Sequence, residues 1–320
     1  MQVVIGANKG LGHAIACQLA ERGREVTAIA RGKAEGAFAL PAGVMQRQVD
    51  ARDPSALRAA CAGASVLYHC ANVGYSQWDS VHPVLMRSVL QVAQELRAVV
   101  VFPGNNYGYG RLQHQPARED HPLAAHTRKG KLRNRLEEQL LKAHAEGRIR
   151  AVIPRLPDFY GPRCVNGLMA PIFEGALSGR KALWPASLDQ PHDLVFVEDA
   201  AAAAVRLAEN AACHGRAWHV PGPGPLTGRE FIHMAFAAAG TEPRVGVLPG
   251  WLLRIVGLFQ ADAGELVELL YEFSEPMRLD GSRFAAAHPE FRYTPHAKAV
   301  AQTVQWFRTR AAGSEVRWSE

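Results

Sequence analysis

A short apolar strand that runs straight into a glycine-rich turn and a helix constrains the fold more than any other feature. Residues 3–5 lead into Gly6-Ala7-Asn8-Lys9-Gly10-Leu11-Gly12, and residues 13–22 have helical spacing with Ile15 and Leu19 on the side expected to be buried. Glycines let the backbone turn tightly and approach a pyrophosphate, whose charge is met by free N–H groups and the positive helix end. The context between a strand and a helix therefore predicts a dinucleotide-binding turn.

The first half of the chain alternates short apolar runs with stretches of helical spacing. The predicted strands are residues 3–5, 26–29, 44–49, 66–70, 99–102 and 150–154. This rhythm is typical of a mostly parallel sheet with both faces covered by helices. Later residues predict one more strand at 194–199, followed by an alanine-rich helix with Asp199 as its N-cap, and further helices at 228–239, 248–259, 265–273 and 297–310.

The predicted fold class is therefore α/β, a Rossmann-type doubly wound, mostly parallel sheet with a smaller mixed α/β C-terminal substrate cap. We assign residues 1–162 to the dinucleotide-binding domain, to which residues 193–212 return. Residues 163–192 and 213–320 are assigned to the substrate-binding cap. The cleft between the two units is the expected site.

Composition excludes several other classes of protein. The 320 residues are 48% hydrophobic and 21% charged, as in ordinary globular proteins. The longest apolar stretch, residues 248–259, is interrupted by Arg254 and is shorter than the roughly 18 residues of a membrane span. The start has no basic signal-peptide region, and the five cysteines form no C-x-x-C pair that indicates a metal site. We expect a cytoplasmic protein without metal or membrane partners.

The net charge of +6 and the basic residues at 128–135 raise the question of nucleic acid binding. Without interleaved aromatic residues or a recognition-helix pattern, this cluster is interpreted as a solvated helix face. The expected partner is a small-molecule substrate and not a nucleic acid, and a homodimer is left open.

Glycines at the first, fifth and seventh positions of the turn resemble the short-chain dehydrogenase/reductase superfamily, in its single-domain branch. The rest of the chain resembles the extended, epimerase/dehydratase-like branch. The matching segments are residues 66–72 (V-L-Y-H-C-A-N), 157–163 (P-D-F-Y-G-P-R) and 197–201 (V-E-D-A-A). The resemblance covers residues 3 to about 307 and implies a nicotinamide dinucleotide, with Asp50 beside the adenine and Ala71 and Asn72 along the cofactor.

The end of the second predicted strand indicates which dinucleotide is bound. An acid there holds the ribose 2′-hydroxyl of NAD, whereas a 2′-phosphate needs positive charge. Here the strand ends in Arg31-Gly32-Lys33, with no acid, and Lys9 stands where the NADP-preferring members that the chain resembles have a second basic residue. We therefore expect NADP. The implied cofactor-binding residues are Gly6, Asn8, Lys9, Gly10, Leu11, Gly12, Arg31, Asp50, Ala71, Asn72 and Lys131.

The catalytic pattern of the superfamily is incomplete in this chain. Its Tyr-x-x-x-Lys pair shares one helix face, and the residues aligned with that pair are Thr127 and Lys131. A shift of two residues would bring Lys129 into the lysine place, with Ala125 in that of tyrosine. The serine with which the superfamily polarises the substrate carbonyl is also missing, and Asn105 or Asn106 could donate a hydrogen bond in its place.

The candidate proton donors are Tyr107, Tyr109, Tyr160 and His126, and the full set of candidate catalytic residues is Lys131, Tyr107, Tyr109, Tyr160 and Asn105. The sequence thus favours an NADP-dependent oxidoreductase or epimerase/dehydratase-like enzyme that acts on a small organic substrate through an atypical site. The alternative is a non-catalytic NADP(H)-binding regulator or redox sensor.

Overall fold

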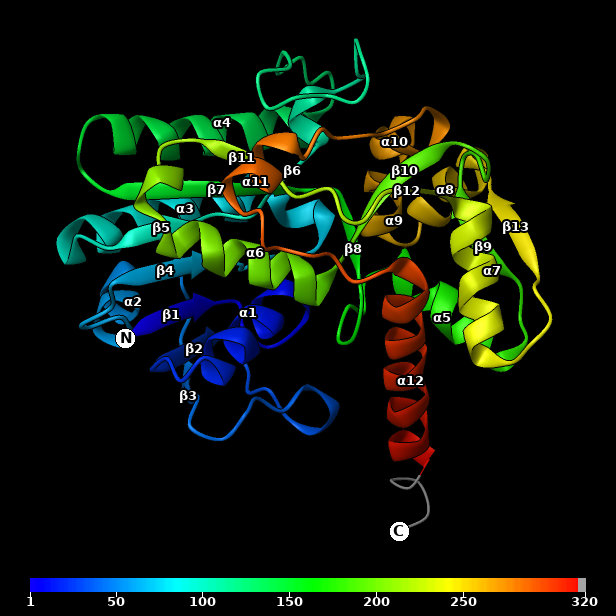
Figure 1. Cartoon of the computed structure of the whole chain (residues 1–320), viewed down its shortest axis with the longest axis horizontal. Coiled ribbons are helices and arrows are strands. Elements are labelled where there is room, and N and C mark those ends of the chain that lie inside the picture. The colour runs from blue at the N-terminus through cyan, green and yellow to red at the C-terminus, as the bar shows by residue number, and fades with distance from the viewer. Residues whose placement is uncertain (316–320) are drawn as a thin grey trace.

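The computed structural model describes residues 1–315 and is built on one large parallel sheet (Figure 1). The strand order is β11-β7-β5-β4-β1-β2-β3, with β6 paired to β7, and the pairings are parallel. The strands are β1 (Gln2–Ile5), β2 (Val26–Ala30), β3 (Met45–Gln48), β4 (Val66–His69), β5 (Val99–Val101), β6 (Gly104–Asn105), β7 (Arg150–Leu156) and β11 (Ala217–His219). The predicted parallel sheet is confirmed.

Helices cover both faces of this sheet because successive strand residues point to opposite sides. Val3 and Val100 face a core formed with α2 (Pro54–Ala60), α3 (Trp78–Leu96) and α4 (Arg128–Ala145). Val4 and Val101 face the other core, formed with α1 (Gly10–Glu21) and α6 (Val197–Glu209). Both faces are therefore buried, as the continuous apolar strand sequences predict.

A second unit lies beside the carboxyl ends of the strands (Figure 1). It contains the sheet β12-β10-β8 and the pair β13-β9, with strands β8 (Asp158–Tyr160), β9 (Ala182–Pro185), β10 (Pro191–Phe196), β12 (Pro225–Thr227) and β13 (Val245–Leu248). Its helices α5 (Met169–Ser178), α7 (Gly228–Ala239) and α12 (His296–Glu315) enclose a separate apolar core. The remaining helices are the short α8 (Gly250–Gly257), α9 (Ala261–Glu265), α10 (Tyr271–Ser274) and α11 (Ser282–Ala287).

Two details differ from the sequence prediction. Within the range 213–320 that we assigned to the cap, β11 pairs with β7 and extends the main sheet; residues 316–320 lie outside the described residues. Asp199 is not an N-cap, since α6 already begins at Val197. Its carboxylate instead accepts hydrogen bonds from the backbone N–H and hydroxyl of Thr294, at 2.7 and 2.9 Å, and so ties α6 to the segment before α12.

None of the helices in the described part of the chain has the length and apolar character that a membrane span requires.

Candidate functional site

The glycine turn joins β1 to α1 and is packed too closely for larger residues. Gly6 has φ +88°, and a Cβ there would lie 2.6 Å from the backbone of Ala71 at the end of β4. A Cβ on Gly12 would lie 2.2 Å from the carbonyl oxygen of Gly6. Gly10, at φ +55°, donates its N–H to the carbonyl of Arg163 at 3.0 Å. The turn thus forms a cradle, that is, a stretch of backbone at the start of a helix that the glycines leave uncovered. This arrangement binds anionic groups.

A small pocket lies next to this cradle, where β2 and β3 end. Its lining includes Asn8, Gly32, Lys33, Gln46 and Arg47, and no acidic residue. Arg47, on the edge strand β3, is a cation that sequence reasoning did not place here. Because the pocket carries two cations and no carboxylate, its charge suits a phosphate more than a ribose hydroxyl.

The other residues expected at the cofactor occupy varied positions. Arg31 and Lys9 are exposed beside the pocket and do not line it. The side chain of Leu11 is buried in the core between α1 and the sheet, which leaves its backbone as the part that faces the turn. Asn72 accepts hydrogen bonds at its Oδ1 from His82 Nε2, at 3.1 Å, and from a backbone N–H.

Asp50 lies past the end of β3 and is held by its own neighbour along the chain. Arg52 donates to the Asp50 carboxylate from its guanidinium and its backbone N–H, at 2.5 to 3.0 Å. These hydrogen bonds lower the pKa of Asp50 to about 2. The carboxylate therefore stays charged and is already paired with a cation.

The helix α4 shows a different register from the one we expected. Thr127, expected in the tyrosine place, is the N-cap, and its hydroxyl accepts the N–H of Gly130 at 3.1 Å. Lys131, expected in the lysine place, is exposed on the outer face of the helix. The residues four apart on the buried face are Lys129 and Arg133, which are 3% and 6% exposed. This is neither of the two alignments considered from the sequence.

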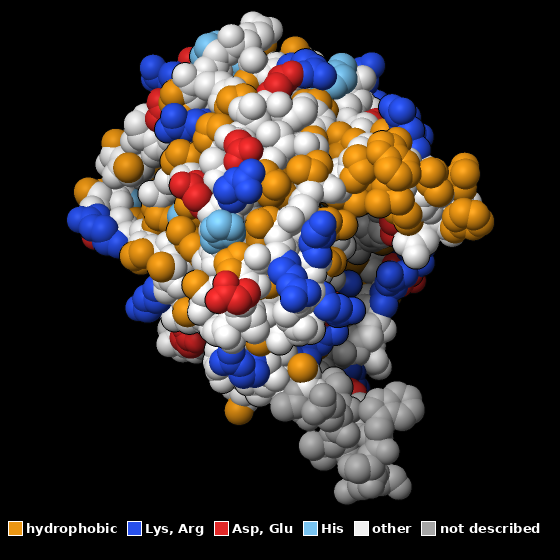
Figure 2. Space-filling model, turned by 90° about the vertical axis from the view of Figure 1, so that its right-hand side faces the viewer, with side chains coloured by type: hydrophobic (Ala, Val, Ile, Leu, Met, Phe, Trp, Pro, Cys, Tyr) orange, Lys and Arg blue, Asp and Glu red, His pale blue; other side chains and the backbone are white. Residues whose placement is uncertain are grey.

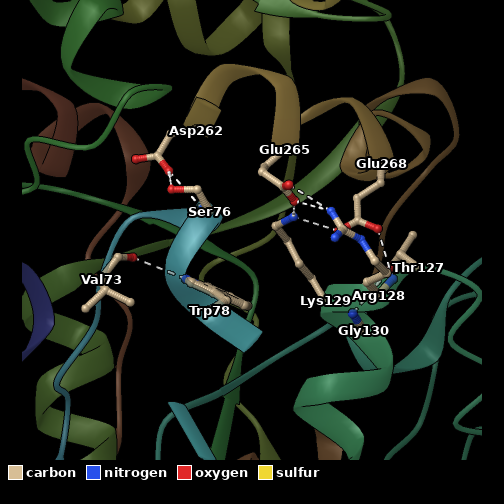
Figure 3. Close-up of polar contacts among 10 residues, drawn as sticks. All are labelled: Val73, Ser76, Trp78, Thr127, Arg128, Lys129, Gly130, Asp262, Glu265 and Glu268. Carbon is tan, nitrogen blue, oxygen red and sulfur yellow. Dashed lines mark hydrogen bonds and ion pairs between the residues drawn. The ribbon is translucent and has the colours of Figure 1, made fainter. Parts of the chain in front are cut away.

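Lys129 is paired with two carboxylates from residues 261–274, which we call the cap segment (Figure 3). Its Nζ pairs with Glu265 and with Glu268, the latter at 2.6 Å. Arg128 adds a guanidinium contact to Glu265 at 2.6 Å and a backbone N–H to Glu268 at 2.9 Å. These ion pairs and hydrogen bonds hold the cap segment against the first turn of α4.

A second contact fastens the same cap segment on the other side of the site (Figure 3). The carboxylate of Asp262 accepts hydrogen bonds from the backbone N–H and the hydroxyl of Ser76, at 2.9 and 2.7 Å. Desolvation would raise the pKa of Glu265, but the hydrogen bonds from Lys129 and Arg128 outweigh it and leave the pKa below its usual value.

Arg133 lies at the carboxyl edge of the main sheet. Its guanidinium carbon is 4.5 Å from the centroid of the Phe102 ring and 6.0 Å from that of Trp78. Its Nη2 donates to the carbonyl of Pro103 at 2.5 Å, and its Nε has no hydrogen-bond partner among the described residues. A permanent cation is thus held in a fixed orientation, with one donor unused, just after β5.

Two tyrosines lie between these cations and a pair of carboxyl groups. The hydroxyls of Tyr75 and Tyr107 share a hydrogen bond of 2.9 Å, and the Tyr75 ring lies 5.5 Å from Lys129 Nζ. Burial, first of all, raises the pKa of both phenols, and the charges of Asp158 and Glu272 add to the effect. Buried phenols that share one hydrogen bond keep their protons at neutral pH and can pass one along.

The carboxyl groups of Asp158 and Glu272 are themselves shifted toward the protonated form. Burial raises the pKa of Asp158 to about 6. Burial also raises the pKa of Glu272 well above its usual value, and the nearby charge of Asp158 adds to this. Glu272 is 3% exposed and is hydrogen-bonded to Tyr271 and Asn106. Asp158 can therefore donate or accept a proton near pH 6, and burial favours the protonated form of Glu272.

Two of the other candidate tyrosines lie elsewhere. Tyr109 is fully buried and shares hydrogen bonds of 2.5 Å with His219 and with Arg155, far from solvent. Tyr160 is buried in the cap core, with its hydroxyl 2.9 Å from Nδ1 of His296. Asn105 accepts the backbone N–H of Tyr107 at 3.3 Å. The structure therefore connects Tyr107 to Tyr75, whose ring faces Lys129, places Asn105 beside Tyr107, and keeps Tyr109 and Tyr160 in separate packed clusters.

The residues that sequence reasoning missed are Arg133, Tyr75, Asp158, Glu265, Glu268 and Glu272. Part of the signal was present in α4. Leu132, Leu136 and Leu140 define its buried stripe, and all are buried. Residues three or four positions away from these leucines share their face, which selects Lys129 and Arg133 and places Lys131 opposite.

Comparisons with known proteins identify the family and the fold. The chain matches the sequence family described as "NAD dependent epimerase/dehydratase family" over residues 2–220. No curated protein matches the chain in sequence.

Solved structures with the same fold span nearly the whole chain. The enzyme WbmH from Bordetella bronchiseptica, in complex with NAD+, is 22% identical and has a TM-score of 0.75 over 96% of this chain and 97% of its own. UDP-glucose 4-epimerase from Thermus thermophilus, in complex with NAD, is 20% identical, with a TM-score of 0.77 over 96% and 99%. dTDP-glucose 4,6-dehydratase from Bacillus anthracis, in complex with NAD, is 13% identical, with a TM-score of 0.79 over 96% of both chains.

These likenesses establish the fold, and the match of the sequence family over more than half of the chain establishes the family. The chain belongs to the NAD dependent epimerase/dehydratase family.

Proposed function

We propose that the protein is an NADP-dependent oxidoreductase or epimerase/dehydratase-like enzyme for a small organic substrate, in which Lys129 and Arg133 serve in place of the usual tyrosine and lysine. One observation carries this proposal. These two residues are buried, four apart, on the face of α4 at the carboxyl edge of the parallel sheet. That edge is where sheets of this kind bind their ligands.

The residues of the turn and of the neighbouring pocket fit a dinucleotide. The bare backbone at Gly6 and Gly12 suits a pyrophosphate, and Lys33 and Arg47 suit a 2′-phosphate. Arg31 and Lys9, exposed beside the pocket, add positive charge to the same corner. When bound, the dinucleotide supplies the hydride donor or acceptor.

The chain's own residues supply binding and proton transfer in this proposal. Arg133 is always charged and has a donor to spare, so it binds ribose hydroxyls as the family lysine does. The Lys129 ammonium donates a hydrogen bond to a substrate oxygen and stabilises negative charge that develops there. The hydroxyls of Tyr75 and Tyr107, with Asp158 behind them, hold and move the proton.

Calorimetry tests the cofactor part of the proposal. The purified protein should bind NADPH more tightly than NADH, and Arg47→Asp should reduce this preference because a carboxylate repels the 2′-phosphate. Arg97→Asp, an exposed arginine after α3, is the matched control and should leave the preference unchanged. Tighter binding of NADH by the parent protein would reject NADP as the cofactor.

A screen of carbonyl compounds, activated alkenes and nucleotide sugars, followed by NADPH absorbance or by product analysis, tests the enzyme part. Lys129→Met should abolish turnover of any substrate found and leave NADPH binding within about threefold, since Lys129 is assigned to the substrate. The rival function, a non-catalytic regulator, is favoured by one observation: the Lys129 ammonium is already paired with two carboxylates. Absence of any turnover, together with a change in oligomeric state between NADP+ and NADPH, would favour the regulator.

A further inference from the structure

The helix α8 and the turn after it expose large apolar side chains on their outer face. Trp251 is 62% exposed, Ile255 49%, Leu258 80% and Phe259 86%. Figure 2 shows hydrophobic surface gathered on one side of the molecule and projecting beyond the surface around it. Scattered apolar residues on a surface need no explanation, but a contiguous protruding group indicates a surface that becomes covered.

The exposed apolar residues lie on one side of α8 and in the turn that follows it. Trp251 and Ile255, four residues apart, lie on one side of α8, and Leu258 and Phe259 follow in the turn after Gly257. The opposite side of α8 is already used, since Leu253 is buried against the cap. A helix that is apolar on both sides is normally buried on both. The outer face of α8 therefore has the composition of a buried face without a covering partner in this chain.

Positive charge accompanies the apolar surface. Arg254 is exposed on α8 between the apolar side chains. Val247, in the strand β13 that leads into α8, is 42% exposed. Lys181 and Arg244 are exposed at the opposite ends of β9 and β13 from α8, with Glu242 two residues before Arg244. An exposed arginine among exposed Trp, Ile, Leu and Phe side chains is typical of segments that rest on an anionic lipid surface.

A second copy of the chain fits this surface less well than lipid does. In a symmetric pair formed through α8, Arg254 would face its own counterpart, and like charges repel. The ridge is also narrow, whereas a stable protein interface uses about 20–30 residues on each side. A bilayer needs only a few inserted side chains and attracts cations through its acidic headgroups.

We propose that the outer face of α8, with Trp251 and Ile255, and the turn after it, with Leu258 and Phe259, insert into the headgroup region of a bilayer that contains anionic lipid. The protein then binds the membrane peripherally, through one short helix. This proposal does not depend on the proposed function, although it bears on the site. The chain continues from α8 into α9, whose Asp262 and Glu265 contact Ser76 and Lys129. Docking through α8 therefore places the candidate site close to the lipid surface.

Co-sedimentation with large unilamellar vesicles tests the proposal on the full chain. Vesicles of phosphatidylcholine alone are compared with vesicles that also contain phosphatidylglycerol. The parent protein should bind the mixed vesicles more tightly. Leu258→Ser with Phe259→Ser should lower the partition coefficient about tenfold or more, and Arg254→Glu should lower binding to the mixed vesicles about fivefold.

The matched control is the pair Met45→Ser with Leu123→Ser, which are 49% and 48% exposed in other parts of the fold. It should bind vesicles like the parent protein, and thermal unfolding checks that all variants are folded. Failure of the parent protein to bind mixed vesicles would overturn the proposal, as would equal binding by the Leu258 and Phe259 variant. A dimer in light scattering that this variant dissociates would assign the surface to a second copy instead.

Discussion

Replacing Lys129 with methionine should release the cap segment from α4. Lys129 is 3% exposed, and its partners Glu265 and Glu268 are 24% and 22% exposed. Removing one partner of a buried ion pair costs ~3–5 kcal/mol. The two carboxylates keep some access to water and Glu265 keeps Arg128, so we expect a loss of about 2–3 kcal/mol in the stability of this contact. Because these ion pairs join only the cap segment to α4, the loss of stability should be confined to the cap segment.

Hydrogen exchange followed by mass spectrometry measures this opening directly. A loss of about 2–3 kcal/mol corresponds to about 30- to 150-fold faster exchange of peptides that cover residues 261–274. Lys131→Met is the matched control, because Lys131 lies two residues away on the exposed face of the same helix. It should leave exchange unchanged. Unchanged exchange in the Lys129 variant, or equal acceleration in the Lys131 variant, would refute the assigned helix register.

Three further predictions concern the turn, the buried ion pair and pH. Gly12→Ala should abolish NADPH binding in calorimetry, because its Cβ would lie 2.2 Å from the Gly6 carbonyl oxygen. Arg155→Met should lower stability in urea unfolding by ~3–5 kcal/mol, since it leaves the 4% exposed side chain of Glu137 without its partner, and Glu137→Gln in the same chain should restore part of the loss. Glu265 has a pKa below its usual 4.5, so its stabilising effect is present above that pH and is lost as pH falls through the lower, folded-state value. Exchange of the cap segment, corrected for the intrinsic rate, should therefore rise below about pH 4.5 and stay flat above it.

The main sheet was predictable from the sequence because its signals are local. Each strand of a parallel sheet buried on both faces is a continuous apolar run, and residues 3–5 and 99–101 are such runs. The glycine turn was also predictable, since the tight approach of Gly6 to Ala71 requires the residue type that the sequence shows. The assignment of β11 to the main sheet was harder to predict from the sequence, because it depends on pairing with β7, which is distant along the chain.

The candidate site was only partly predictable, and the reasons differ. The choice of Lys131 came from alignment with a family pattern, and the helical period of the leucines in α4 argues against it. The partners of Lys129 were beyond local reasoning, since Glu265 and Glu268 are more than 130 residues away and meet it only through cap docking. The contact between Tyr75 and Tyr107 likewise joins two loops whose paths depend on tertiary packing.

The NADPH affinity of variants on the two faces of α4 shows which face contacts the cofactor. We propose that Arg133 contacts it and that Lys131 does not. A charge-assisted hydrogen bond contributes ~1.5–3 kcal/mol, so Arg133→Met should weaken NADPH binding about tenfold or more in calorimetry, with partial recovery in Arg133→Lys. Lys131→Met should change it less than about twofold. Strong loss in the Lys131 variant with unchanged binding in the Arg133 variant would contradict the account.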